Sequence, residues 1–251
     1  MQINKVLATW ENWGNCNPNF AKLTTPPKII ARSNDGLTNG AFFLSTRSDK
    51  KIEFTLKLFS PLSNTYGINR QHEVYIQTKV AELGLAPTLI HVDYGIGFVV
   101  SEFIEGKIFN DLSKLPLKIK NLLIEAISSY QAITLDIPEF NYYEHLHRYA
   151  ENCSNTLIGN DLKQWQEFSV HLKQWQTQQR TLKLTHHDLN PNNIIVADNS
   201  LAIIDWEYAG LGAGELDWLA IGEASNSVST TNQRIIIQIS FWLEKLWLLQ
   251  E

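Results

Sequence analysis

The stretch LTHHDLNPNNIIVADNSLAIIDWEYA, residues Leu184–Ala209, decides the fold and the function class of this chain. Within it, Asp188 is followed by Asn193 and, after two short apolar runs, by Asp205. The two runs lie within Ile194–Ile204 and are separated by Asp-Asn-Ser, which is typical of a β-hairpin. Because both ends of a hairpin return to the same place, Asn193 and Asp205 are expected at one site.

The side chains of this stretch are those that hold Mg²⁺ beside a catalytic carboxylate. Amide and carboxylate oxygens are hard ligands, which Mg²⁺ prefers. A further carboxylate on the same loop can accept or orient a hydroxyl proton during phosphoryl transfer. An isolated aspartate at Asp188 would more often be a turn or N-cap residue, and Pro191 favours a turn. The complete pattern favours the catalytic interpretation.

The pattern His-x-Asp-x-x-x-x-Asn, followed by a hydrophobic hairpin and Ile-Ile-Asp-Trp-Glu, resembles the aminoglycoside phosphotransferase and choline kinase family, the small-molecule branch of the protein-kinase-like fold. The run IIDWEYAG looks most like choline/ethanolamine kinase-like and thiamine kinase-like members. The resemblance implies an α+β, bilobal protein-kinase-like fold. Residues 1–104 would form a β-rich, nucleotide-binding lobe with one helix, and residues 105–251 a mainly helical lobe with the catalytic loop and the substrate site.

The same resemblance implies the roles of the residues in the opening stretch. Asp188 would be the catalytic base, and His186 would brace its loop without transferring protons. Asn193 and Asp205 would bind Mg²⁺ and so bridge the phosphates of ATP. The chain would then be an ATP- and Mg²⁺-dependent phosphotransferase that uses an alcohol group as the acceptor.

A phosphate-covering loop is expected in the first lobe, within SNDGLTNGAFF (Ser33–Phe43). This segment departs from the G-x-G-x-x-G of protein kinases, and a plain hairpin turn also accounts for it. No G-x-x-x-x-G-K-[ST] occurs, which disfavours a P-loop enzyme. The resemblance assigns nucleotide binding here to Gly36, Thr38, Asn39 and Gly40.

A lysine in an apolar strand is the candidate for contacting the phosphates. Lys57 lies within IEFTLKLF, where an unpaired charge would lose its hydration at a cost. The resemblance pairs it with Glu73 on the following helix. Lys50 and Lys51 remain alternatives to Lys57, and Glu82 competes with Glu73. The run VVSEFI that follows would be the hinge, with adenine bound by the nucleotide-binding residues Glu102, Phe103 and Ile104.

Aromatic and acidic residues after Asp205 suggest a cationic acceptor, because aromatic faces and carboxylates together bind cations. The residues in question are Trp206, Glu207, Tyr208, Glu215, Asp217 and Trp218, of which Trp206, Glu207, Asp217 and Trp218 are the predicted substrate contacts. In the alternative interpretation, the two tryptophans belong to the core and the acids cap helices, and Asp217 is a candidate for bonding the catalytic loop. Residues 184–233 hold seven acidic residues and no Lys or Arg, which agrees with a cationic preference.

Composition and charge exclude several other classes. Apolar residues make up 44% of the 251 residues, enough for a large core, and the net charge of −5 disfavours nucleic acid as a partner. Two distant cysteines, Cys16 and Cys153, indicate neither a disulfide framework nor a metal site. No apolar run reaches 18 residues, so no membrane association and a cytoplasmic location are expected. Zinc at His145-x-His147 is disfavoured, and these histidines with Tyr149 could instead line the acceptor side.

Three functions remain open at this point. The first is a kinase for a small cationic molecule, either choline/ethanolamine-like or thiamine. The second is an aminoglycoside phosphotransferase. The third is a catalytically inactive kinase-like binding module. The sequence leaves the oligomeric state unknown.

Hydrophobic periodicity predicts the elements that would carry these residues. The predicted strands are Ala41–Ser45, Lys51–Phe59, Thr88–Val92, Ile96–Phe103, Ile194–Ala197 and Leu201–Ile204. The predicted helices are Arg70–Leu83, one starting with Pro116 in its first position, Asp161–Arg180 and Gln233–Leu249.

Overall fold

A five-stranded antiparallel sheet forms the N-terminal part of the computed structural model, which describes residues 2–33, 39–178, 181–223 and 230–250. A short helix, α1 (Gln2–Leu7), precedes the sheet, and α2 (Arg70–Ala81) is inserted between its third and fourth strands. The spatial order is β1-β2-β3-β5-β4. The strands are β1 (Lys28–Ser33), β2 (Asn39–Ser45), β3 (Phe54–Phe59), β4 (Leu89–Asp93) and β5 (Phe98–Glu102).

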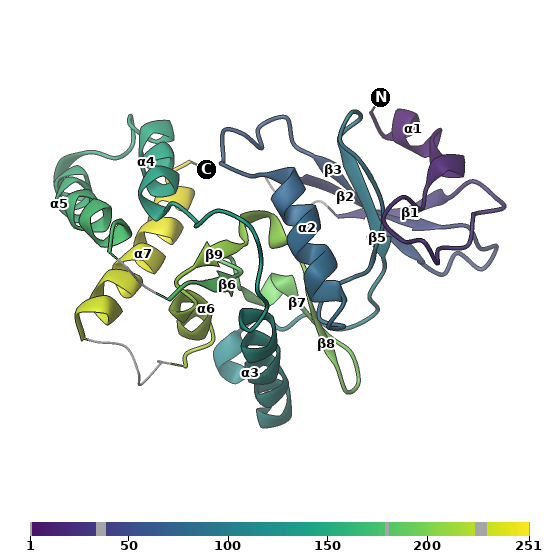
Figure 1. The fold of residues 1–251 in the computed structure, drawn as a ribbon. Coiled ribbons are helices and arrows are strands. Elements are labelled where there is room, and N and C mark those ends of the chain that lie inside the picture. Colours follow the sequence, from purple (N-terminus) through teal and green to yellow (C-terminus); the bar gives the residue numbers. More distant parts are fainter. Residues whose placement is uncertain (1, 34–38, 179–180, 224–229, 251) are drawn as a thin grey trace.

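Helices dominate the C-terminal part, on the other side of the molecule from the sheet (Figure 1). Two small ribbons lie between the helices and the sheet: β6 (Lys183–Thr185) pairs with β9 (Gly210–Gly212), and β7 (Ile194–Val196) with β8 (Leu201–Ile203). The predicted α+β fold class is therefore confirmed. The helices are α3 (Leu117–Gln131), α4 (Tyr142–Asn152), α5 (Gly159–Gln176), α6 (Glu215–Ala220) and α7 (Thr230–Leu248).

Local sequence explains where the helices that matter for the site begin. The side chain of Asn69 accepts hydrogen bonds from the backbone N–H groups of Gln71 and His72, at 3.0 and 3.2 Å, and so caps α2. Asn141 caps α4 in the same way. Helix α3 begins one residue later than predicted: Pro116, expected in its first position, is the N-cap, and the helix starts at Leu117.

Three clusters of buried apolar side chains build the core. One lies against the sheet and includes Phe98, and another joins α4, α5 and α7 around Trp242. The central cluster places Ile76 of α2 with Ile203 of β8 and with Trp206. Helix α2 thus shares its buried face with the β7–β8 hairpin that follows the loop of Asp188, so the two elements hold one another in place.

A glycine allows the chain after the sheet to lie close to this hairpin. A Cβ on Gly106 would come within 2.7 Å of the carbonyl oxygen of Val196 and 2.5 Å of a methyl group of Ile195. The next residue, Lys107, exchanges backbone hydrogen bonds with Val196 at 2.8 Å in both directions. The connection therefore belongs with the C-terminal elements, although the boundary at residues 104 and 105 stays a prediction.

Among the described residues, no helix combines the length and the apolar character that crossing a bilayer requires. A cytoplasmic location stays a prediction.

Candidate active site

Asp188 lies between β6 and the turn Pro191–Asn193, with its carboxylate held by two amides. The side-chain nitrogen of Asn190 donates to Oδ1 at 2.9 Å, and that of Asn193 donates to Oδ2 at 3.0 Å. Burial raises the pKa of Asp188, while these two hydrogen bonds act in the opposite direction. The result is an oriented carboxylate in a half-buried position, suited to accept a proton from a bound hydroxyl.

A second aspartate, Asp217, holds the backbone of the loop just before Asp188. Asp217 is buried and accepts the backbone N–H groups of His186 at 2.9 Å and of His187 at 3.3 Å. It also accepts the hydroxyl of Tyr130 at 2.7 Å. Although its residue borders the pocket, its carboxylate oxygens are used by the protein itself. The predicted substrate contact at Asp217 is therefore replaced by the alternative in which it bonds the catalytic loop.

The Tyr130 hydroxyl is expected to contribute measurably to stability. Replacing Tyr130 by Phe keeps the ring but leaves a buried carboxylate with one donor fewer. A hydrogen bond to a charged group is worth about 1.5–3 kcal/mol, so Tyr130→Phe should lower the free energy of unfolding in urea by about that amount. Tyr75→Phe on α2, at an exposed ring, is the matched control and should change it by less than about 0.5 kcal/mol. Equal values for the two variants would contradict this role of Tyr130.

His186 and His187 are fixed in neutral form beneath the site. A ring nitrogen of His186 lies 3.0 Å from the carbonyl oxygen of Ile204, and its ring packs edge-to-face on Trp206. The backbone of His187 has a φ of 66°, a left-handed conformation that is rare outside glycine. Burial lowers the pKa of His187 to about 3, and its ring bonds the Tyr142 hydroxyl at 2.7 Å. The bracing function expected of His186 thus agrees with its contacts, and His187 has a similar one.

The structure brings Lys57 of β3 to Glu73 of α2, with Nζ and Oε1 2.8 Å apart. Lys57 also contacts Asp205 at 2.5 Å and Glu207 at 3.0 Å. The three carboxylates raise its pKa against the opposing effect of burial, so the ammonium stays charged. The competing residues lie elsewhere: Lys51 pairs with the exposed Glu105, and Glu82 pairs with Lys79 at the surface.

Arg70, at the start of α2, is a residue of this cluster that the sequence analysis missed. Its Nη1 lies 2.6 Å from Glu73 Oε2 and 2.9 Å from Glu207 Oε2. Glu73, Asp205 and Glu207 offer carboxylate oxygens within 4.8 Å of one another. Lys57 and Arg70 both pair with this cluster, so Glu207 is an ion-pair partner. Glu207 also borders the pocket beside Asp188, and its contact with the substrate stays a prediction.

Asn193 and Asp205 fit the requirements of a Mg²⁺ ion. The side-chain nitrogen of Asn193 is used by Asp188, both at the carboxylate and at the backbone oxygen, so its amide oxygen is the atom left for a cation. The Asp205 side chain is one-third exposed and borders the same pocket as Asp188. Its backbone has a φ of 65°, a left-handed conformation, so the chain leaves the extended conformation of β8 at this residue. Burial raises its pKa, and Lys57 opposes that shift.

The nucleotide side of the site is described in part. Gly36 and Thr38 lie outside the described residues, whereas Asn39 and Gly40 begin β2 opposite Phe59 and Leu58 of β3. Glu102 ends β5, and the ring of Phe103 packs edge-to-face on Phe43 at 5.6 Å. The segment expected to be the hinge therefore comprises most of β5, the strand beside Lys57, and the two residues that follow it. The adenine-binding role of Glu102, Phe103 and Ile104 stays a prediction.

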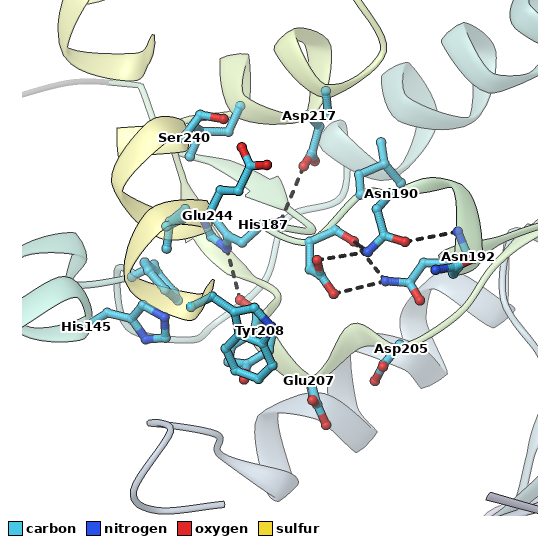
Figure 2. A pocket seen from close by; sticks show the side chains of 18 of the residues that line it. His145, His187, Asn190, Asn192, Asp205, Glu207, Tyr208, Asp217, Ser240 and Glu244 are labelled. Atoms are coloured by element: carbon cyan, nitrogen blue, oxygen red, sulfur yellow. Dashed lines mark hydrogen bonds between the residues drawn. The ribbon is translucent and has the colours of Figure 1, made fainter. Parts of the chain in front are cut away.

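A pocket of about 660 Å³ opens beside Asp188 (Figure 2). Helix α7 borders it with Ser240 and Glu244, while Asn190 and Asn192 of the loop after Asp188 lie on the opposite side. Four aromatic side chains complete the wall, namely Phe140, Tyr149, Tyr208 and Trp247. Tyr149 and Tyr208 are among the candidates from the sequence, whereas Phe140 and Trp247 are not.

The tryptophans predicted to contact the substrate do not line this pocket. Trp206 is fully buried, donates its indole N–H to the carbonyl oxygen of Ile203 and packs on Tyr130. Trp218 packs against the central core and donates to the side chain of Gln131 at 3.1 Å. Both predictions are corrected, because the rings serve packing. Of the histidine pair, His145 lines the pocket, and His147 lies at the surface.

Three of the seven acidic residues of 184–233 are paired with bases from other segments. Asp205 and Glu207 are paired with Lys57 and Arg70, as described above, and Glu223 pairs with Lys120 at 2.7 Å. Charge in this segment therefore does not by itself indicate a cationic substrate. The pocket offers a different anion, Glu244 of α7, which lies outside that segment.

Comparisons with known proteins agree with this geometry. A family model described as the phosphotransferase enzyme family matches residues 30–217. Protein LicA of Haemophilus influenzae is 24% identical over 200 residues, which cover 76% of this chain and 57% of that relative. The match thus spans little more than half the length of that relative.

Solved structures of LicA superpose on the chain. The choline kinase LicA of Streptococcus pneumoniae has a TM-score of 0.67 at 22% identity, covering 89% of this chain and 85% of that one. A structure of LicA in complex with AMP has a TM-score of 0.68 at 20% identity, covering 91% and 85%. At these identities the likeness establishes a common fold.

Proposed function

Because the chain belongs to the phosphotransferase enzyme family, we propose that it is an ATP- and Mg²⁺-dependent kinase for the hydroxyl group of a small cationic molecule. Among acceptors we favour choline or ethanolamine. One observation carries the proposal: the carboxylate of Asp188 faces a pocket that also borders Asp205 on one side and Glu244 with aromatic rings on the other. In the proposed function, a proton acceptor, a metal ligand and a cation-binding wall would therefore border a single space.

The proposed mechanism uses the side chains in the positions described. Asp188 orients the acceptor hydroxyl and takes its proton as the oxygen attacks the γ-phosphorus, roughly in line with the leaving oxygen of ADP. Asn193 and Asp205 would hold Mg²⁺, which when bound neutralises negative charge on the phosphate oxygens. Lys57, kept in place by Glu73, contacts the phosphates. Tight positioning of these groups accounts for most of the acceleration expected of such a site.

The acceptor end of the pocket favours positive charge. Tyr149, Tyr208 and Trp247 supply aromatic faces that attract cations, and Glu244 supplies a carboxylate. His145 does not oppose this, since burial together with the nearby charge of Arg148 lowers its pKa to about 3 and keeps it neutral. Burial likewise keeps His187 neutral, because it lowers the pKa of that ring to about 3.

The acceptor is tested by measuring ADP release with choline, ethanolamine, thiamine and several aminoglycosides. Turnover with choline or ethanolamine supports the proposal, and turnover with thiamine or an aminoglycoside alone would reassign the substrate. Binding of Mg·ATP without turnover of any acceptor would favour a kinase-like binding module. The 251-residue chain is used for each assay.

Trp247→Leu separates cation recognition from simple apolar contact. Loss of the indole face should raise KM for choline about tenfold and leave KM for ATP unchanged. For 3,3-dimethylbutan-1-ol, the uncharged isostere of choline, the change should be small. Phe241→Leu is the matched control, because this exposed aromatic lies on the same helix and outside the pocket lining. Equal increases of KM for the two alcohols would argue against a cationic acceptor.

A further inference from the structure

Two cations of different character share the carboxylate cluster of Glu73, Asp205 and Glu207. Lys57 reaches all three through one flexible side chain. Arg70 reaches Glu73 and Glu207 through a planar guanidinium. Oε2 of Glu207 accepts from both cations, at 3.0 Å from Lys57 and 2.9 Å from Arg70. Glu207 is therefore doubly paired in this structure.

Arg70 is fixed in its place on every side. Its Nε and Nη2 donate to the hydroxyl of Ser63 at 3.1 and 2.9 Å, and its guanidinium stacks over the ring of Phe59 at 4.8 Å. The side chain is 10% exposed. A guanidinium fork bound at several N–H groups cannot turn away from one partner without losing the others. Lys57, in contrast, carries its charge on a stem that can rotate.

Nucleotide binding would give Lys57 and Arg70 different partners: Lys57 would contact the phosphates, and Arg70 would stay with Glu207. In the proposed function, Lys57 contacts the phosphates and Asp205 contacts Mg²⁺. A turn of the Lys57 ammonium towards the phosphates would draw it away from Glu207, whose side chain is only 3% exposed. A buried carboxylate that loses its counter-ion is strongly destabilised. Arg70 remains within 2.9 Å of that carboxylate.

We propose that Arg70 is a positioning residue: it stays paired with the buried carboxylate of Glu207, so that the Lys57 side chain can turn from that carboxylate to the phosphates of the nucleotide. This inference rests on the proposed function. It assigns Arg70 no contact with substrate. It also accounts for the attachment of the start of α2 to the Trp206–Tyr208 turn, since the same guanidinium bonds Glu73 of α2 and Glu207 of the turn.

The test is a double-mutant cycle on Mg·ADP affinity, measured by calorimetry. Arg70→Met should raise the Kd of Mg·ADP at least about tenfold. Glu207→Gln removes the charge that Arg70 is proposed to hold. In the double variant, the further effect of Arg70→Met should fall to less than about threefold. Lys79→Met, at an exposed lysine on the same helix, is the control and should bind as the unmodified chain does.

The possible outcomes distinguish this inference from the proposed function. A Kd for Arg70→Met equal to that of the unmodified chain, or an equal loss with and without Glu207, would overturn the positioning role while leaving the kinase assignment intact. Failure of the unmodified chain to bind Mg·ADP would overturn both. If Arg70→Met does not fold, as judged by circular dichroism, Arg70→Lys replaces it in the cycle, with a smaller expected loss that must again depend on Glu207.

Discussion

Asp188→Ala should lower kcat by about 10³-fold while the Kd of Mg·ATP changes little. The carboxylate is the group that accepts the hydroxyl proton, and alanine has none to offer. The affinity for Mg·ATP should be preserved, because Asn193 is still held in position by a second hydrogen bond. Its side-chain nitrogen also donates to the backbone oxygen of residue 188 at 2.9 Å, which alanine retains. The measurement is steady-state ADP release together with calorimetric titration of Mg·ATP.

The control for this variant is Asp198→Ala, at an exposed aspartate in the turn of the β7–β8 hairpin. It removes the same charge from the same segment and should leave kcat within about twofold of the starting value. A kcat for Asp188→Ala near that of the control would contradict the catalytic role. A loss of Mg·ATP binding equal to the loss of kcat would instead make Asp188 a nucleotide-binding residue.

Much of the fold follows from local signals that tertiary contacts did not override. The β2–β3 and β7–β8 hairpins, α2, α5 and α7 were predicted within a few residues, because their apolar residues recur at the spacing of a strand or a helix. Helix α4 was missed although Leu146 and Ala150 lie four residues apart on its buried face. The rest of that face consists of Tyr142, His145 and Tyr149, which a simple apolar pattern does not register.

The β6–β9 ribbon could not be read from the sequence for a different reason. Each strand has three residues, and the pairing joins segments that lie far apart in the chain, with Leu184 opposite Leu211. It also depends on a close approach, since a Cβ on Gly212 would come within 2.2 Å of the Tyr142 hydroxyl. Such contacts are set by the packed structure and leave no periodic signal.

The site shows the same division between local and distant information. The spacing from Asp188 to Asn193 and Asp205 reflects one loop and one hairpin, so it could be read from the sequence. Glu244 and Trp247 lie on the last helix and reach the pocket through the packing of α7 against α4 and α6. In the sequence, their spacing is that of an ordinary helix face. The residues that close the acceptor side therefore required the structure.

Asp205→Asn is expected to remove the dependence of nucleotide affinity on Mg²⁺. For the unmodified chain, ADP should bind more tightly with Mg²⁺ than with EDTA, and for the variant the two values should be close. Because the phosphates would lose part of their charge neutralisation, kcat should fall by about 10²–10³-fold. Asparagine is the right replacement, since it tolerates the left-handed backbone at this position, with its φ of 65°, better than alanine does.

The same variant tests whether Asp205 acts on the metal or on Lys57. Without its charge, the Lys57 ammonium keeps Glu73 and Glu207 as partners, at 2.8 and 3.0 Å, so the cluster should remain assembled. If Asp205 served only to hold Lys57, ADP affinity in EDTA would change and the effect of Mg²⁺ would persist. If it is a metal ligand, affinity in EDTA should stay the same or rise, because one negative charge near the phosphates is gone, and only the gain from Mg²⁺ should disappear. The comparison with and without Mg²⁺ therefore separates two functions that loss of turnover alone cannot.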